Sequence, residues 1–172
     1  MRRLTWIILL GSLLPPVVFG QEKQKKLDPC ALLTAADAAS IAGAPMPLVD
    51  RSKDNCTYGV LGKRIPGGGR ALDRSVEFSV KTYKSAQALD KEWGKARDAH
   101  NSVHKNDTQG PGGIGDEAFL PDRTKEGKVT GITSIISVRK GLVVFGILIF
   151  DKDIAAYADE AIAVAKRIAD RL

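Results

Sequence analysis

The stretch that decides the fold is residues 132–150, which read ITSIISVRKGLVVFGILIF. The pattern predicts two strands, over 132–138 and 142–150, joined by a tight hairpin turn at Lys140–Gly141. The second strand is apolar on both faces, so we expect it to be central in a sheet and covered on both sides. Because strands joined by a tight turn run antiparallel, the pattern favours an α+β fold over a parallel α/β fold.

Two further strands are predicted before this hairpin. Residues 74–83 alternate between apolar and polar side chains, which is typical of a half-buried strand, and residues 56–61 form a shorter candidate. The polar, glycine-rich stretch from Gly62 to Arg74 between them predicts a loop. The fold class that follows is a single α+β domain, in which an antiparallel sheet of about four or more strands packs with helices.

Helices are predicted at three places. A capping box at Thr34–Asp37 begins a short helix that ends at Gly43. A second helix follows Ser85, because its apolar positions step by three and four residues. The last helix spans about 154–171, with Asp153 as its cap.

The N-terminus has the three-part form of a secretory signal peptide. Arg2 and Arg3 give a charged start, an apolar run follows, and Val18 and Gly20 supply the small residues before a cleavage site. The apolar run is short for a membrane span, which needs about 20 residues. We predict cleavage after Gly20, and an uncleaved anchor is the alternative.

Cleavage would divide the chain into a signal peptide (1–20), a flexible leader (21–27) and the single domain (28–172). The product would be periplasmic or secreted, with no transmembrane segment left. The chain of 172 residues is 44% hydrophobic, which excludes a disordered protein, and its net charge of +6 would fall to +4 with the loss of two arginines. This modest excess, without a basic and aromatic surface pattern, predicts no binding to nucleic acid.

Export also gives a meaning to Cys30 and Cys56, the two cysteines of the chain. Outside the cytosol such a pair usually oxidises, which predicts a disulfide bond. The bond would close a loop of about 25 residues and stabilise the fold by roughly 3 kcal/mol. A nucleophilic or metal-binding cysteine is the alternative, but the chain has no Cys-x-x-Cys spacing.

Four basic side chains surround the predicted glycine-rich loop, and they are Lys63, Arg64, Arg70 and Arg74. They form a possible anion-binding loop for a small anionic ligand, a lipid headgroup or an acidic partner. The alternative is a solvated hairpin. The loop lacks the Gly-Lys-Ser/Thr ending of a nucleotide-binding P-loop.

The two histidines, His100 and His104, have the spacing of a zinc-protease helix but lack its glutamate, which is the general base. A bare metal site would need a third ligand, for which Asp98 and Asp107 are the nearest candidates. A packed or capping histidine pair is the alternative. We therefore predict no metal, no cofactor and no catalytic residues.

Two other motifs are weaker still. Residues 110–115 satisfy the letters of a dinucleotide-binding G-x-G-x-x-G, but a polar loop precedes them and Asp116–Glu117 follows, so we predict a loop with special backbone angles. Residues 151–153 are similar to the D-x-D start of a haloacid-dehalogenase-type phosphatase. About twenty residues follow, too few for the remaining residues of that site.

Three segments together resemble a family of small bacterial cell-envelope lipoproteins of unknown function. They are DPCALLTAAD at 28–37, CTY at 56–58 and GIGDEAF at 113–119. The resemblance implies a disulfide between Cys30 and Cys56, a fold near the Mog1/PsbP-like group and no catalytic residues. The chain departs from the family because it lacks a lipid-bearing cysteine.

The expected function is that of an exported, non-enzymatic envelope protein that binds a small ligand or a protein partner. An enzyme or metal-binding protein with a site around His100 and His104 is the main alternative. A purely structural envelope component is a third.

Overall fold

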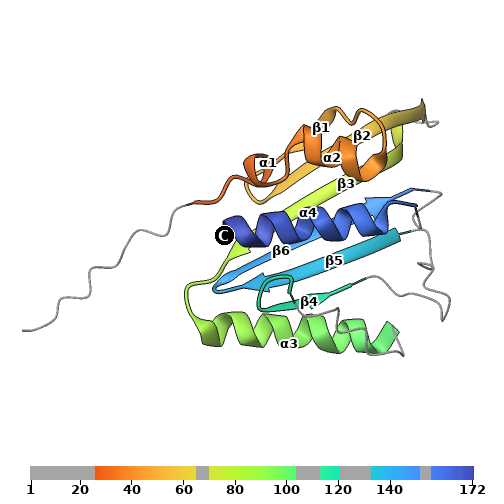
Figure 1. Ribbon diagram of the computed structural model, residues 1–172. Coiled ribbons are helices and arrows are strands. Elements are labelled where there is room, and N and C mark those ends of the chain that lie inside the picture. The colour runs from red at the N-terminus through yellow and green to blue at the C-terminus, as the bar shows by residue number, and fades with distance from the viewer. Residues whose placement is uncertain (1–25, 65–69, 104–112, 121–132, 152–155) are drawn as a thin grey trace, which may run out of the picture.

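The computed structural model describes residues 26–64, 70–103, 113–120, 133–151 and 156–172 (Figure 1). The predicted signal peptide, His104, Asp107 and Asp153 lie outside these residues. The elements, in chain order, are α1 (Pro29–Leu32), α2 (Ala35–Ala42), β1 (Leu48–Arg51), β2 (Asn55–Arg64), β3 (Arg70–Thr82), α3 (Ala86–Val103), β4 (Glu117–Phe119), β5 (Thr133–Lys140), β6 (Val143–Phe150) and α4 (Ala158–Arg171).

The described strands form one six-stranded sheet in the order β1-β2-β3-β6-β5-β4, and every neighbouring pair is antiparallel. The predicted α+β fold with an antiparallel sheet is therefore confirmed. The predicted hairpin joins β5 to β6, and Gly141 adopts the left-handed conformation in its turn, with φ of 56°. Strand β6 lies between β3 and β5, so it is central, as predicted. The expected cover on both faces is wrong, because the residues of β6 on one face are only half-buried and Phe150 is 41% exposed.

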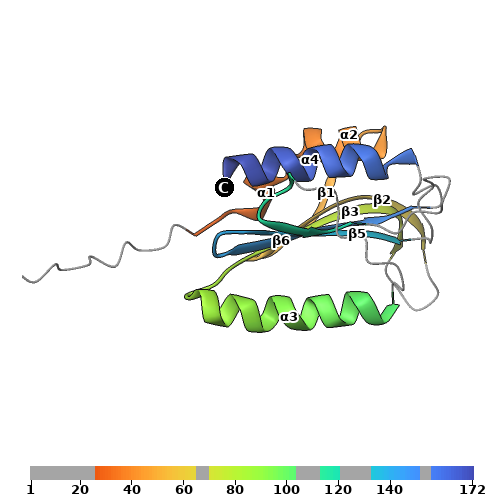
Figure 2. The same cartoon turned by 60° about the horizontal axis from the view of Figure 1, so that its bottom comes forward.

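Helices cover both faces of the sheet (Figure 2). Helices α1, α2 and α4 lie on one face, here called the core face, and α3 lies on the other, here called the α3 face. The alternation of each strand sends successive side chains to opposite faces. On β3, for example, Val76 and Phe78 point to the core face, while Glu77 and Ser79 point to the α3 face.

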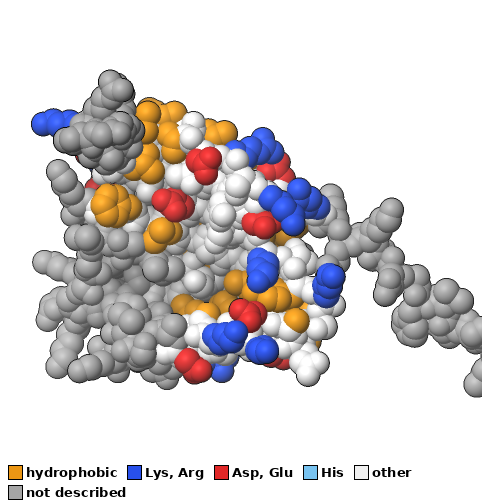
Figure 3. All heavy atoms as spheres, turned by 180° about the vertical axis from the view of Figure 1, so that it is seen from behind, with side chains coloured by type: hydrophobic (Ala, Val, Ile, Leu, Met, Phe, Trp, Pro, Cys, Tyr) orange, Lys and Arg blue, Asp and Glu red, His pale blue; other side chains and the backbone are white. Residues whose placement is uncertain are grey.

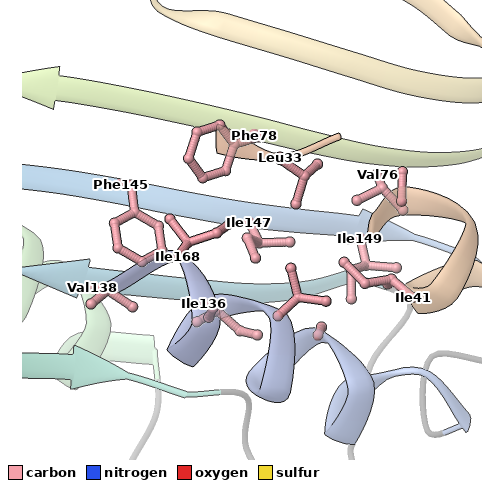
Figure 4. Packing of buried hydrophobic residues seen from close by; sticks show 14 of the residues in the cluster. Leu33, Ile41, Val76, Phe78, Ile136, Val138, Phe145, Ile147, Ile149 and Ile168 are labelled. Carbon is pink, nitrogen blue, oxygen red and sulfur yellow. The ribbon is translucent and has the colours of Figure 1, made fainter. Parts of the chain in front are cut away.

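The main hydrophobic core fills the space between the core face and its three helices (Figure 4). Its largest fully buried side chains come from α1 to α2, from the central strands and from α4. They include Leu33, Ile41, Val76, Phe78, Ile136, Val138, Phe145, Ile147, Ile149 and Ile168. Burial of this many apolar side chains is the main source of stability.

The predicted disulfide is present between Cys30 and Cys56, whose Cα atoms are 5.3 Å apart. It joins α1 to β2 beside the main core. Two further contacts hold the same segment, because Tyr58 Oη donates to the carbonyl of Leu33 at 2.9 Å and Arg171 Nη2 donates to the carbonyl of Leu32 at 2.9 Å. Burial raises the pKa of Tyr58, which is consistent with a phenol that stays neutral inside the core.

A smaller cluster holds α3 against the opposite face. Leu89 and Trp93 of α3 pack with Phe119 of β4, and the rings of Trp93 and Phe119 stack with centroids 4.6 Å apart. Trp93 Nε1 and Arg97 Nη2 both donate to Glu117 Oε2 at 2.7 Å. The hydrogen bond from Trp93, together with the neighbouring arginines, holds the pKa of Glu117 below its ordinary value. These contacts fix α3 over the β4 side of the sheet.

Several predicted boundaries were wrong. Strand β2 continues to Arg64 and β3 starts at Arg70, so most of the predicted loop from Gly62 to Arg74 is strand. The cross-strand pairs Leu61–Leu72 and Arg64–Arg70 extend the pairing of β2 with β3, with register shifts after Val60 and after Leu61. The glycines of this stretch led to the prediction of a loop instead. The short edge strands β1 and β4 were not predicted.

The last helix also differs from its prediction. Its first residue is Ala158, later than predicted, and the capping position is held by Tyr157 without a side-chain hydrogen bond. The capping box of α2 and the left-handed Gly43 after it are confirmed. None of the described helices is long and apolar enough to cross a bilayer.

Candidate functional site

The four basic residues that predicted an anion site do not form one group among the described side chains. Lys63 is exposed on β2, whereas the side chains of Arg64 and Arg70 lie outside the described part of the structure. Arg74 points to the core face and pairs with the buried Asp151. Its guanidinium also donates to the carbonyl of Ala42 at 3.0 Å and lies 5.3 Å from the centre of the Tyr157 ring. Arg74 therefore links β3 to the end of β6 and to α2 and α4.

The histidine site stays a prediction. His100 lies in α3, but its side chain, like all of His104 and Asp107, is outside the described residues. Asp98 is exposed on the same helix. Among the residues that the structure describes, no three His, Cys, Asp or Glu side chains gather to hold a metal ion.

The glycine-rich motif at 110–115 is a loop with special backbone angles in its described part. Gly113 and Gly115 have φ values of 126° and 61°, and residues 110–112 lie outside the described residues. A Cβ at Gly115 would overlap the carbonyl oxygen of Arg139. The next residue, Asp116, accepts from the backbone N–H of Gly141 at 2.6 Å, which lowers its pKa. The motif therefore docks β4 against the β5–β6 hairpin.

A different region of the molecule has the geometry of a binding site. Strand register aligns four small or polar residues in one row across the α3 face, and they are Asn55 of β2, Ser79 of β3, Gly146 of β6 and Ser137 of β5. Gly146 is in the middle of the row and has no side chain, so the sheet surface is lowest there. We call this row and the cavities above it the central trough.

Two adjoining cavities, of about 340 and 290 Å³, lie over this row and share all four of its residues. A Cβ built at Gly146 would come within 3.2 Å of Ser79 Oγ, so the serine hydroxyl lies beside the lowest point. A glycine inside a central strand weakens the strand and often marks a place where another group approaches the backbone. The trough thus has the size of a small-molecule site.

Larger side chains form the walls of the trough on either side of the row. One wall contains Thr57, Glu77 and Leu148, and the other contains Lys81, Tyr83 and Val144. In Figure 3 this face has a broad area of backbone and uncharged polar side chains, bordered by charged residues. Helix α3 borders the trough at one wall, because its apolar cluster packs against Tyr83 and Val144, while its hydrogen bonds to Glu117 lie on the β4 side.

No described residue forms a hydrogen bond with the side chains of Asn55, Ser79 or Ser137. A hydroxyl both donates and accepts, and an amide offers both kinds of group, so the floor suits a ligand with mixed polarity.

A further cavity of about 340 Å³ continues the trough past Lys81. Its lining includes Lys26, Lys53 and Lys81 together with the carboxylate of Asp54. Asp54 and Lys81 line both this cavity and the trough. The trough therefore has a predominantly basic end.

Sequence reasoning missed these residues, although a partial signal exists. The alternation of 74–83 places Ser79 on the polar side of its strand, and Gly146 interrupts an apolar strand. That the two are neighbours depends on the pairing of β3 with β6, which are separated by α3 and two further strands in the chain. No motif at fixed spacing records such a pairing.

Comparison with protein-family models, with curated proteins and with solved structures finds no match for this chain. The resemblance to small envelope lipoproteins therefore stays a prediction, and the geometry of the trough is the main guide to function.

Proposed function

We propose that the protein is an exported binding domain that holds a small polar ligand in the central trough. The observation that carries the proposal is the row of small or polar residues that includes Gly146, beneath an open cavity on the α3 face of the sheet. A large apolar residue at these positions would bury more surface, and glycine in a strand costs about 0.5–1 kcal/mol relative to alanine. A recess that lowers stability in this way fits selection for binding.

Two features support the exported part of the proposal. The N-terminal sequence has the form of a signal peptide, and the two cysteines are paired, which is the usual state in an oxidising compartment. The resemblance to cell-envelope proteins agrees with both. Binding, and not catalysis, is proposed because no base among the described residues is hydrogen-bonded to the hydroxyl of Thr57, Ser79 or Ser137 in the lining.

Binding is tested by NMR. The sample is the protein purified from cells that express the full chain, after any cleavage that those cells carry out. Neutral saccharides, small anions, amino acids and short peptides are titrated separately, and amide shifts are mapped. We expect at least one class to shift Ser79, Gly146 and Ser137 together. If every class leaves these amides unchanged, or acts only elsewhere, the binding proposal is wrong.

A variant that fills the trough checks the location. Ser79→Leu places a large side chain over Gly146, and we expect it to abolish the shifts. The matched control is Gln87→Leu, which adds the same side chain at an exposed position of α3. Equal binding by the two variants would contradict a site in the trough.

Export is tested separately by cell fractionation combined with thiol labelling. We expect the protein outside the cytosol with both cysteines blocked from labelling. A cytosolic protein with two reactive thiols would overturn the exported part alone.

A further inference from the structure

The charges on the two walls of the trough define its ligand more narrowly. Glu77, Ser79 and Lys81 occupy alternate positions of β3 and therefore point to the same face. At about 3.3 Å per residue, the Cα atoms of Glu77 and Lys81 are about 13 Å apart, with the floor serine between them. One strand thus presents a carboxylate and an ammonium group on opposite sides of the cavity.

The carboxylate of Glu77 has no cationic partner among the described residues. Its hydrogen bond comes from Ser75 Oγ, at 3.4 Å, and its cross-strand neighbours are Thr57 and Leu148. Neither neighbour is charged, and the side chain of Glu77 is half-buried. A ligand ammonium group would therefore find an unneutralised carboxylate, next to an apolar side chain that reduces screening by water.

The opposite wall has the complementary charge. The Lys81 ammonium lies 4.7 Å from the centre of the Tyr83 ring, and no described carboxylate is within ion-pair distance of it. Its charge does help to lower the pKa of Glu92 on α3. Lys53 and Lys26 line the adjoining cavity, against the single carboxylate of Asp54. This end therefore favours an anionic group.

We infer that the trough binds a short extended peptide with free termini, with its ammonium group at Glu77 and its carboxylate at Lys81. The inference rests on the proposed function and specifies its ligand. Glu77 contacts Ser75 and Lys81 contacts Tyr83, so both charged groups point away from Ser79 and lie farther apart than the two Cα atoms. The gap therefore suits a tripeptide or a somewhat longer peptide, which extends about 3.3–3.6 Å per residue. A single amino acid has its two charges too close together to contact both walls.

The floor fits the backbone of such a peptide. Peptide N–H groups need acceptors and peptide carbonyls need donors, and the side chains of Asn55, Ser79 and Ser137 offer both. The absence of a side chain at Gly146 lets the peptide backbone approach the sheet. The trough is open to solvent on one side, which leaves room for different side chains of the peptide. We therefore expect selectivity for the two charged termini of the peptide and not for a particular sequence.

The test compares four forms of trialanine by titration calorimetry: unmodified, N-acetylated, C-amidated and blocked at both ends. We expect each block to weaken binding about three- to tenfold, as expected for the loss of one partly screened ion pair. Glu77→Gln should remove the penalty of acetylation, and Lys81→Met should remove that of amidation. Each variant should leave the other penalty in place.

The matched control variants are Asp98→Asn and Lys91→Met on α3, at exposed positions outside the lining of the trough. We expect them to preserve both penalties. Equal binding of all four peptides would overturn the peptide inference. So would a trough that binds only saccharides, phosphocholine or simple anions. Either result would leave the proposed binding function standing. Failure of every compound to perturb the trough would overturn both.

Discussion

The two faces of the sheet differ in composition although the same strands supply both. On β3, the core-face residues Val76, Phe78 and Val80 are at most 5% exposed. Their neighbours on the α3 face, Glu77 and Ser79, contact a cavity. Because successive residues of a strand point to opposite faces, one residue can stabilise the core while the next faces a binding site.

The same contrast extends to the helices. On the core face, α1, α2 and α4 enclose a continuous core. On the α3 face, one helix is held by the small cluster around Trp93 and by the hydrogen bonds to Glu117. We therefore expect large losses of stability from changes on the core face and small losses from changes in the trough.

The largest effect is expected from Phe78→Ala. The ring is 1% exposed and packs against Phe145 with centroids 5.7 Å apart, so its removal leaves a cavity in the main core. The free energy of unfolding should fall by about 3–5 kcal/mol. Urea unfolding followed by circular dichroism measures the change, and a loss below about 1 kcal/mol would contradict the assignment of stability to the core face.

Removal of the disulfide should cost less. The double variant Cys30→Ala with Cys56→Ala releases a crosslink between residues 26 positions apart. Loss of the restriction on the unfolded chain should lower the free energy of unfolding by about 3 kcal/mol. The same urea experiment measures it, and added reductant should destabilise the natural chain but not the variant. A variant as stable as the oxidised protein would show that the contacts of Tyr58 and Arg171 suffice to hold α1.

A still smaller and pH-dependent effect is expected at Glu117, on the α3 side. Its pKa in the folded protein is lower than its ordinary value of 4.5, so its contribution to stability is present above that value and is lost as the pH falls through the folded pKa. Because the side chain is 41% exposed, Glu117→Gln should cost only about 1 kcal/mol at pH 7.

Urea midpoints and Trp93 fluorescence at pH 7 and pH 3 test this linkage. The difference between the natural chain and Glu117→Gln should shrink as the pH is lowered towards 3, because the carboxylate takes up a proton as the pH falls through its folded pKa. Asp98→Asn, at an exposed position of the same helix, is the control. A difference that stays constant with pH would show that Glu117 acts through packing and not through its charge.

The smallest effect is expected from Ser79→Ala in the trough. The side chain is exposed and has no hydrogen bond to a described residue, so the free energy of unfolding should change by at most about 0.5 kcal/mol. Urea unfolding of Ser79→Ala and of Phe78→Ala, measured in parallel, compares the loss of stability at two adjacent positions that face opposite sides of the sheet. A loss near that of Phe78→Ala would remove the distinction between the two faces.

Much of this fold follows from local patterns. Alternation in 74–83, the turn at Gly141 and the capping box of Thr34 each depend on interactions within a few residues, and each is confirmed. The edge strands β1 and β4 were missed because they are four and three residues long and exist through pairing with a longer neighbour. Helix α4 begins late for a similar reason, since its start carries no capping side chain.

The candidate site could not be predicted in the same way. Gly146 and Ser79 have meaning only as neighbours, and that relation depends on the register of two distant strands. Arg74, one of the four basic residues of the predicted anion-binding loop, has a structural role instead, because it pairs with Asp151 and donates to the carbonyl of Ala42. A charge on a strand can point to either face, and its sequence position alone does not give the face when the strand contains bulges.

The central place of β6 also has a consequence for the order of folding. A chain that emerges from its N-terminus forms β2 and β3 early, but β3 gains its second neighbour only when β6 arrives, and α4, which covers the core, comes last. Contacts between distant segments make folding slow. If the chain is threaded through a membrane channel, its sheet stays incomplete until nearly all of the chain has crossed. Cys30 and Cys56 emerge early, so their bond can form before the sheet that later buries Cys56 is complete.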